Sequence, residues 1–308
     1  MASIDDLAWK YFSIFQRRYN DLNQTHEYSG MMSAYEAVFE EAKKDPELAK
    51  DIHNPALEEI EAMKEAYVAN SFRCLAQPEE AARHFKKALS LGKHDLVMAV
   101  ILEFKGIYGT QSGDPEQAIK DQQRALDYYK KAGHFEKVAR VSSTLGAAYT
   151  KKEEYEKAIS HFTQARAAAD DVLRKMIDEK DKPNKPCTDR YNSRSIHMVK
   201  ADAYQGEGEA LTLQGTMLDG DAARDKYARA IKWFDNSLGI AERLDHTAGF
   251  KAVVNLRKAY TYAMLGEETK SKASYRLFQI NAESVQPNAL EVIKPYIEQV
   301  EYFLGIRK

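Results

Sequence analysis

The chain has 308 residues, of which 44% are hydrophobic and 30% are charged, and its formal net charge is -2. This balance gives no electrostatic case for binding nucleic acid, because proteins that do so usually carry a basic patch or a high pI. With 15 glycines and 8 prolines, the chain has too few turn residues for a turn-rich β protein, so its composition favours helices.

The first residues and the cysteines indicate the cellular compartment of the protein. The opening stretch MASIDDLAWKYF is acidic where a secretory signal is basic, and no stretch approaches the roughly 18 apolar residues that indicate a membrane span. Cys74 and Cys187 lie far apart, so no disulfide framework is indicated and two reduced thiols are expected. The sequence therefore predicts a cytoplasmic protein without an integral membrane segment.

The first predicted helical pair covers residues 4–44, and it is divergent. The stretches DDLAWKYFSIFQRRYNDL and SGMMSAYEAVFEEAKKD each carry an apolar stripe at helical spacing. Phe39 and Ala42 occupy the positions where later second helices present an aromatic and a small residue. We therefore expect this pair to pack like the pairs that follow it.

A pattern of small and aromatic residues repeats from about residue 62 to residue 172. In LGAAYTKKEEYEKAISHFTQA, residues 145–165, small side chains let two antiparallel helices approach, while Tyr149 and Phe162 fill the space beside them. The alanines at 81, 118 and 158 are spaced by 37 and 40 residues, and such a period indicates a repeat architecture. The matching positions elsewhere are Phe72, Ala81, Phe85 and Ala88; Tyr108, Ala118 and Ala125; and Ala259, Tyr262, Gly266, Ser271 and Tyr275.

The remaining elements follow a break in the pattern. Residues 178–193, DEKDKPNKPCTDRYNS, predict a solvent loop between a stack at 1–177 and a stack at 194–308, both parts of one continuous superhelix. Residues 195–213 and 224–243 predict another pair, in which Gly208 takes the place of Gly146. The stretch NALEVIKPYIEQVEYFLGI predicts a capping helix, with a kink or a boundary at Pro295.

The segment 62–172 resembles tetratricopeptide (TPR) repeats. Its 40-residue spacing, with KKAGHFEKVARVSSTLGAAY, is similar to the long-helix variety in kinesin light chains and spindle-orientation adaptors. The resemblance implies an all-α fold, a TPR-like right-handed superhelix of antiparallel helix pairs, which is an α-solenoid. It specifies little about function, because TPR units serve very many proteins.

No catalytic, metal or cofactor motif stands out. The eight histidines include no HExxH pair, neither cysteine belongs to a CxxC motif, and QGEGEA at 205–210 lacks the third glycine of a dinucleotide fingerprint. We therefore predict no catalytic residues, no metal site and no cofactor. An enzyme built on a TPR-like solenoid, with a site formed only in three dimensions, stays open.

The resemblance also implies a binding groove. In TPR superhelices the first helix of each pair lines a concave face, where extended or helical peptides bind. The pattern places seven residues on this groove: Asn70, Arg73, Leu102, Arg140, Ser143, Lys151 and Tyr260. The Lys and Asn clamp of TPR cochaperones is not matched, because Ala66 stands where a lysine is expected. We therefore expect a scaffold or adaptor that binds a protein or peptide segment.

Two further functions remain as alternatives. The stretch DPEQAIKDQQRALDYYKKAGHFEKVARV looks like that of the soluble NSF attachment proteins, which are membrane-fusion adaptors, but the chain stops at FLGIRK without their leucine-bearing tail. A peptide-gated regulator usually carries an N-terminal effector domain, for which residues 1–45 are too short. Self-association into a homo-oligomer stays open, since no residue argues for it.

Overall fold

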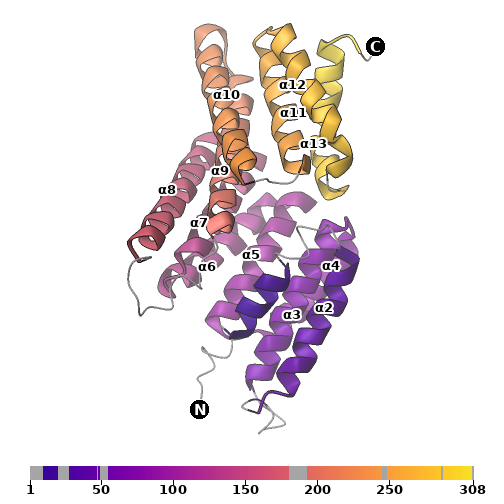
Figure 1. Cartoon of the computed structure of the whole chain (residues 1–308), viewed down its shortest axis with the longest axis vertical. Helices are drawn as coiled ribbons and strands as arrows, with labels where there is room; N and C mark the ends of the chain where they lie inside the picture. Colours follow the sequence, from indigo (N-terminus) through magenta and orange to yellow (C-terminus); the bar gives the residue numbers. More distant parts are fainter. Residues whose placement is uncertain are drawn as a thin grey trace. The chain divides into compact units, whose positions relative to one another are not determined.

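The computed structural model describes residues 10–19, 28–46, 48, 55–179, 193–244, 248–285 and 287–306. Within these ranges every regular element is a helix, so the prediction of an all-α solenoid is confirmed (Figure 1). Residues 10–19 are helical. The helices that follow are α2 (Tyr28–Lys43), α3 (Pro55–Cys74), α4 (Pro78–Leu91), α5 (Asp95–Ser112), α6 (Pro115–Lys131), α7 (Phe135–Lys151), α8 (Tyr155–Glu179), α9 (Ser193–Gly215), α10 (Gly220–Arg243), α11 (Ala248–Met264), α12 (Glu268–Asn281), a short 3-10 turn (Ala282–Ser284) and α13 (Pro287–Phe303).

Consecutive helices pack as pairs. The pairs are α3 with α4, α5 with α6, α7 with α8, α9 with α10, and α11 with α12. The chain forms two compact units, Met1–Gly133 and His134–Lys308. The predicted loop at 178–193 falls inside the second unit, where α8 ends at Glu179 and α9 begins at Ser193, and residues 180–192 lie outside the described residues. A single continuous superhelix stays a prediction.

The turns within pairs follow from local sequence. Pro115 begins α6, where its missing N–H costs no hydrogen bond, and the side chain of Asp114 accepts a hydrogen bond from the Gln117 backbone N–H at 3.1 Å. The preceding helix ends at Gly113, whose φ of +90° is a left-handed conformation that glycine adopts without strain. One short turn thus both ends α5 and starts α6.

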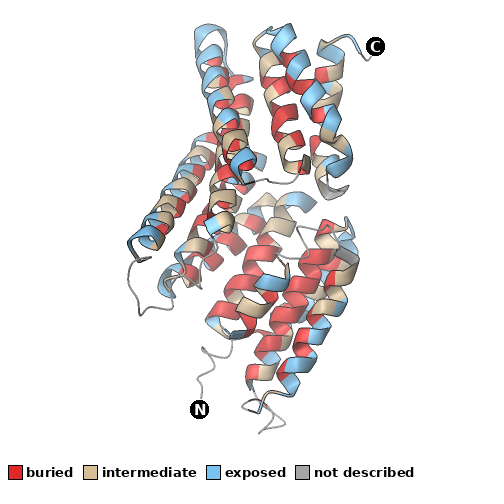
Figure 2. Cartoon of the chain, viewed as in Figure 1, coloured by how far each residue is buried: buried red, intermediate tan, exposed pale blue. Residues whose placement is uncertain are grey.

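Close packing within pairs confirms the predicted pattern. A Cβ at Gly146 would lie 2.7 Å from the Phe162 ring, and a Cβ at Gly208 would lie 2.7 Å from the Phe234 ring. Gly208 is therefore the counterpart of Gly146, as the sequence predicts. Figure 2 shows buried residues along the facing sides of paired helices. The repeated small residues are fully buried, namely Ala81, Ala88, Ala118, Ala125, Ala158, Ala165 and Ser271.

The last helix closes the second unit. Ile293 and Val300 of α13 are buried against a cluster that includes Tyr260 and Tyr275. Pro295 lies inside α13, so no boundary occurs there: the helix runs through it from Pro287 to Phe303.

Two expectations about the compartment can be set against the structure. Cys74 is a buried free thiol, as expected, whereas Cys187 lies outside the described residues. No helix in the described part of the chain is long and apolar enough to cross a membrane.

Candidate functional site

The predicted groove residues of the first unit make their contacts within that unit. Asn70 and Leu102 are each only 1% exposed. Arg73 is half-buried and donates from Nε to Asn70 Oδ1 at 2.8 Å and from Nη1 to Gln111 Oε1 at 2.9 Å. The Arg73 guanidinium therefore joins α3 to α5, and the structure brings Asn70 and Arg73 together.

In the second unit, the first helices of successive pairs are α7, α9 and α11, and α13 follows them. Arg140 of α7 is half-buried, and its Nη2 donates to Ser195 Oγ of α9 at 3.2 Å. Ser195 Oγ donates in turn to Glu136 Oε1 at 3.1 Å. Of the other predicted residues on α7, Ser143 is half-buried and Lys151 is exposed.

A second polar cluster joins α9, α11 and α13. The Nη2 of Arg257 pairs with Glu209 Oε2 at 2.8 Å, and the hydroxyl of Tyr296 donates to Glu209 Oε1 at 2.8 Å. Burial and the adjacent Glu209 carboxylate raise the pKa of Tyr296. The Tyr260 ring meets the Tyr296 ring edge-on, with centroids 5.2 Å apart. This predicted groove residue therefore touches the cluster.

Asp202 of α9 stands between the two clusters. Its side chain is exposed, and its carboxylate makes no hydrogen bond or ion pair in the described part of the chain. The charges of Arg140 and Arg257 favour its ionised form, yet desolvation by the surrounding helices prevails and raises its pKa to about 7.

We call the surface formed by Arg140, Ser195, Asp202, Glu209, Arg257 and Tyr296 the inner face. Ser195, Asp202 and Glu209 are spaced by seven residues, about two turns of helix, so they share one side of α9. The sequence pattern assigns no residue of 195–213 to the groove, so Asp202 is not among the predicted site residues. The seven-residue spacing of polar residues was the signal that could have found it.

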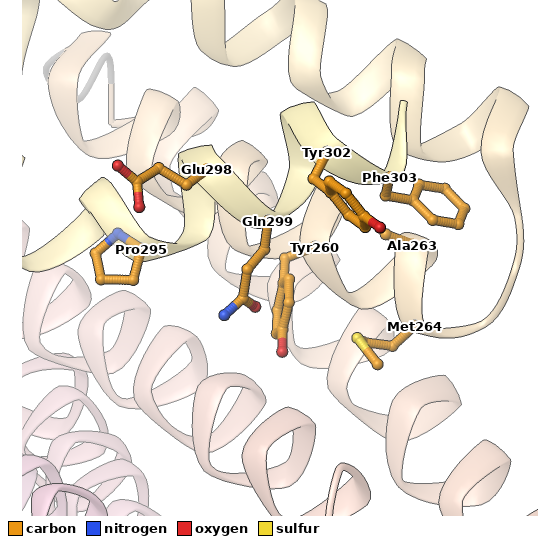
Figure 3. Close-up of a pocket in the computed structure, with 8 residues that line it drawn as sticks. All are labelled: Tyr260, Ala263, Met264, Pro295, Glu298, Gln299, Tyr302 and Phe303. Carbon is orange, nitrogen blue, oxygen red and sulfur yellow. The ribbon is translucent and has the colours of Figure 1, made fainter. Parts of the chain in front are cut away.

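A pocket of about 430 Å³ adjoins the inner face, between α11 and α13. Figure 3 shows its lining residues on these two helices. Tyr260 belongs to the pocket and also contacts Tyr296, so the pocket is continuous with the polar cluster. Tyr302 is 76% exposed, which leaves a large apolar ring open to solvent at the pocket. The lining residues are Tyr260, Ala263, Met264, Pro295, Glu298, Gln299, Tyr302 and Phe303.

The chemistry available at this site is that of binding. The inner face offers guanidinium donors, carboxylate acceptors and, in the pocket, apolar surface. Among the residues that the structure describes, no group of three or more His, Cys, Asp or Glu side chains could hold a metal ion.

Comparisons with known proteins agree with the fold. The tetratricopeptide repeat family model matches residues 97–171, which run from α5 into α8. The structure is similar to that of a Rap protein complexed with competence and sporulation factor, at 15% identity over 94% of this chain and 83% of that one, with a TM-score of 0.57. It is also similar to BtubC (BKLC) from P. vanneervenii, at 16% identity over 83% of this chain and 91% of that one, with a TM-score of 0.52. No curated protein matches the sequence. At these identities the two likenesses establish the fold alone.

Proposed function

We propose that this tetratricopeptide-repeat protein is a scaffold or adaptor, and that it binds a protein or peptide segment on the inner face of its second unit. The observation that carries the proposal is the inner face, where the Asp202 side chain is exposed and makes no hydrogen bond or ion pair with the described residues. Proteins with this repeat commonly bind other proteins. Two helices of the inner face also carry predicted groove residues. These are Arg140, Ser143 and Lys151 on α7, and Tyr260 on α11.

The energetics of the inner face favour a bound ligand. The exposed carboxylate of Asp202 makes no hydrogen bond or ion pair with the described residues, so it can accept a hydrogen bond from a ligand. The adjacent pocket would gain about 25 cal/mol for each Å² of apolar surface that a ligand removes from water. One ligand segment can meet both requirements, because Arg257 and Tyr260 are one turn apart on α11.

A second candidate is a ligand-gated regulator. The likeness to the Rap protein complexed with competence and sporulation factor favours it, because that protein shares the fold and holds a ligand. A regulator changes shape when its ligand binds, whereas a passive scaffold need not. Small-angle scattering of the protein with and without its ligand separates the two: a fall in the radius of gyration supports the regulator.

The proposal is tested by cross-linking capture from the source cells, followed by binding measurements with the purified partner. Arg140→Gln/Lys151→Gln removes two positive charges from α7. The matched control Lys272→Gln/Arg276→Gln removes two from exposed positions of α12. We expect the α7 variant to lose affinity for the partner and the α12 variant to retain it. Equal affinity in both variants would remove the inner face from the proposed function.

A further inference from the structure

We infer that the pocket between α11 and α13 receives an arginine side chain of the bound segment. The rings of Tyr302 and Phe303 pack against its stem and its guanidinium plane, and the Glu298 carboxylate accepts its hydrogen bonds. This inference rests on the proposed function, because it names the ligand residue that anchors the segment beside the inner face.

The two ends of the pocket differ in chemistry. Figure 3 shows Pro295 and Glu298 at one end of the pocket, and Tyr302, Phe303 and Met264 at the other. Its volume of about 430 Å³ lies near the lower limit of the roughly 300–1,000 Å³ that ligand pockets span, so it suits one long side chain. An arginine side chain has the matching arrangement, because its apolar stem ends in a cation.

Three large apolar side chains around this cavity are open to solvent. Tyr302 is 76% exposed, Met264 is 42% exposed and Phe303 is 38% exposed. Exposed apolar side chains that gather at one place mark an interaction site, whereas isolated ones need no explanation. Aromatic faces also attract cations, and a guanidinium stacks on them more readily than the strongly hydrated ammonium of lysine. The aromatic end of the pocket therefore favours arginine.

The charged groups around the pocket favour a cation over an anion. Glu298 is the one charged residue among the eight that line it. In the preceding turn of α11, Arg257 pairs with Glu209. Lys258 of the same turn pairs with Asp235, so both cations already have a carboxylate partner. A ligand carboxylate in the pocket would be repelled by Glu298, whereas a guanidinium is attracted to it.

A neutral apolar side chain fits this lining less well than arginine does. It would cover the Glu298 carboxylate and the Gln299 amide without offering a hydrogen bond to either, and polar groups removed from water without a partner are costly. A guanidinium has five N–H donors, which is enough for both groups. An arginine therefore satisfies the polar end of the pocket while its stem covers the apolar wall.

The experiment uses the full chain and a phage-displayed library of short random linear peptides. A selected peptide is resynthesised with citrulline in place of its arginine, which keeps the length and the stem but carries no charge. Calorimetry then gives the affinity for the wild type, for Glu298→Gln and for the matched control Glu291→Gln, an exposed residue of α13 outside the pocket. We expect citrulline to lower affinity about tenfold with the wild type and the control, and less than threefold with Glu298→Gln.

Tyr302→Leu separates the recognition of a cation from the burial of apolar surface. Leucine keeps an apolar side chain at this exposed position but has no aromatic face. We expect Tyr302→Leu to weaken the arginine peptide about threefold, and to leave the affinity of a peptide with norleucine at the same position within about twofold. Equal losses for the two peptides would overturn the role assigned to the ring.

The outcomes separate the inference from the proposed function. Asp202→Ala and its matched control Asp225→Ala, an exposed residue of α10, report on the inner face. If Asp202→Ala weakens binding, selected peptides that share no arginine, or a citrulline effect that is the same with wild type and Glu298→Gln, would overturn the pocket inference alone. Peptides that need Glu298 but tolerate Asp202→Ala and Arg140→Gln/Lys151→Gln would overturn the proposed function alone. Peptides insensitive to all three variants, or no selected peptide at all, would overturn both.

Discussion

Replacing Gly208 with alanine tests whether the small positions of the pattern set the distance between paired helices. The new Cβ would lie 2.7 Å from Phe234 Cε1. Carbon atoms prefer separations of about 3.5–4.0 Å, so the ring or the helix must move by nearly 1 Å. Overpacking of this kind costs about 1–3 kcal/mol, while replacing a helical glycine gains back about 0.5–1 kcal/mol. The expected net loss is about 1–2 kcal/mol.

The control is Gly239→Ala in α10. Only Arg243 Nη1, at 3.9 Å, comes near a Cβ at Gly239. Alanine at this position therefore has the higher helix propensity without a steric clash. For a unit of this size we expect a Tm about 3–6 °C lower for Gly208→Ala, and a Tm about 1–4 °C higher for Gly239→Ala. Thermal melts followed by circular dichroism measure both. Adding Phe234→Leu should recover part of the loss, because the two sites are in contact. Equal stabilisation by both alanines would refute the packing argument.

Three further changes test the polar groups of the second unit. Burial raises the pKa of Asp202 from an ordinary 3.8 to about 7, so its ionisation opposes folding as the pH rises from about 4 to 7. Asp202→Asn should therefore raise Tm more at pH 8 than at pH 5. Parallel profiles of Tm against pH for the variant and the wild type would contradict this. Tyr296→Phe removes the donor to Glu209 and should cost about 1–2 kcal/mol in urea unfolding; an unchanged midpoint would show that the bond adds nothing. The buried hydroxyls of Thr212 and Thr261 lie 2.8 Å apart, so Thr212→Val should cost about 1–2 kcal/mol and Thr212→Ser less; equal costs would exclude the hydroxyl as the cause.

The packing of the fold is predictable because it depends on residues at short, repeated spacings. Gly146 with Phe162 and Gly208 with Phe234 occupy equivalent positions in two pairs, so one pair predicts the other. A helix ends where a residue such as Gly113 accepts a positive φ, and this too is a local property. Such features need no knowledge of distant segments.

The candidate site is less predictable because its contacts join distant helices. Arg257, Glu209 and Tyr296 come from three different helices, and no local spacing relates them. The first helix of each pair contacts both its own partner and the next pair. An error of one position in its register therefore exchanges a groove residue for a core residue. Leu102, assigned to the groove from the pattern, is 1% exposed.

The central claim is that a ligand segment binds at Asp202 on the inner face. The most direct measurement is a calorimetric titration of one library-selected peptide into Asp202→Ala and into the matched Asp225→Ala variant. The account predicts that affinity falls about tenfold or more with Asp202→Ala and stays at the wild-type value with Asp225→Ala. Wild-type affinity in both variants would contradict it.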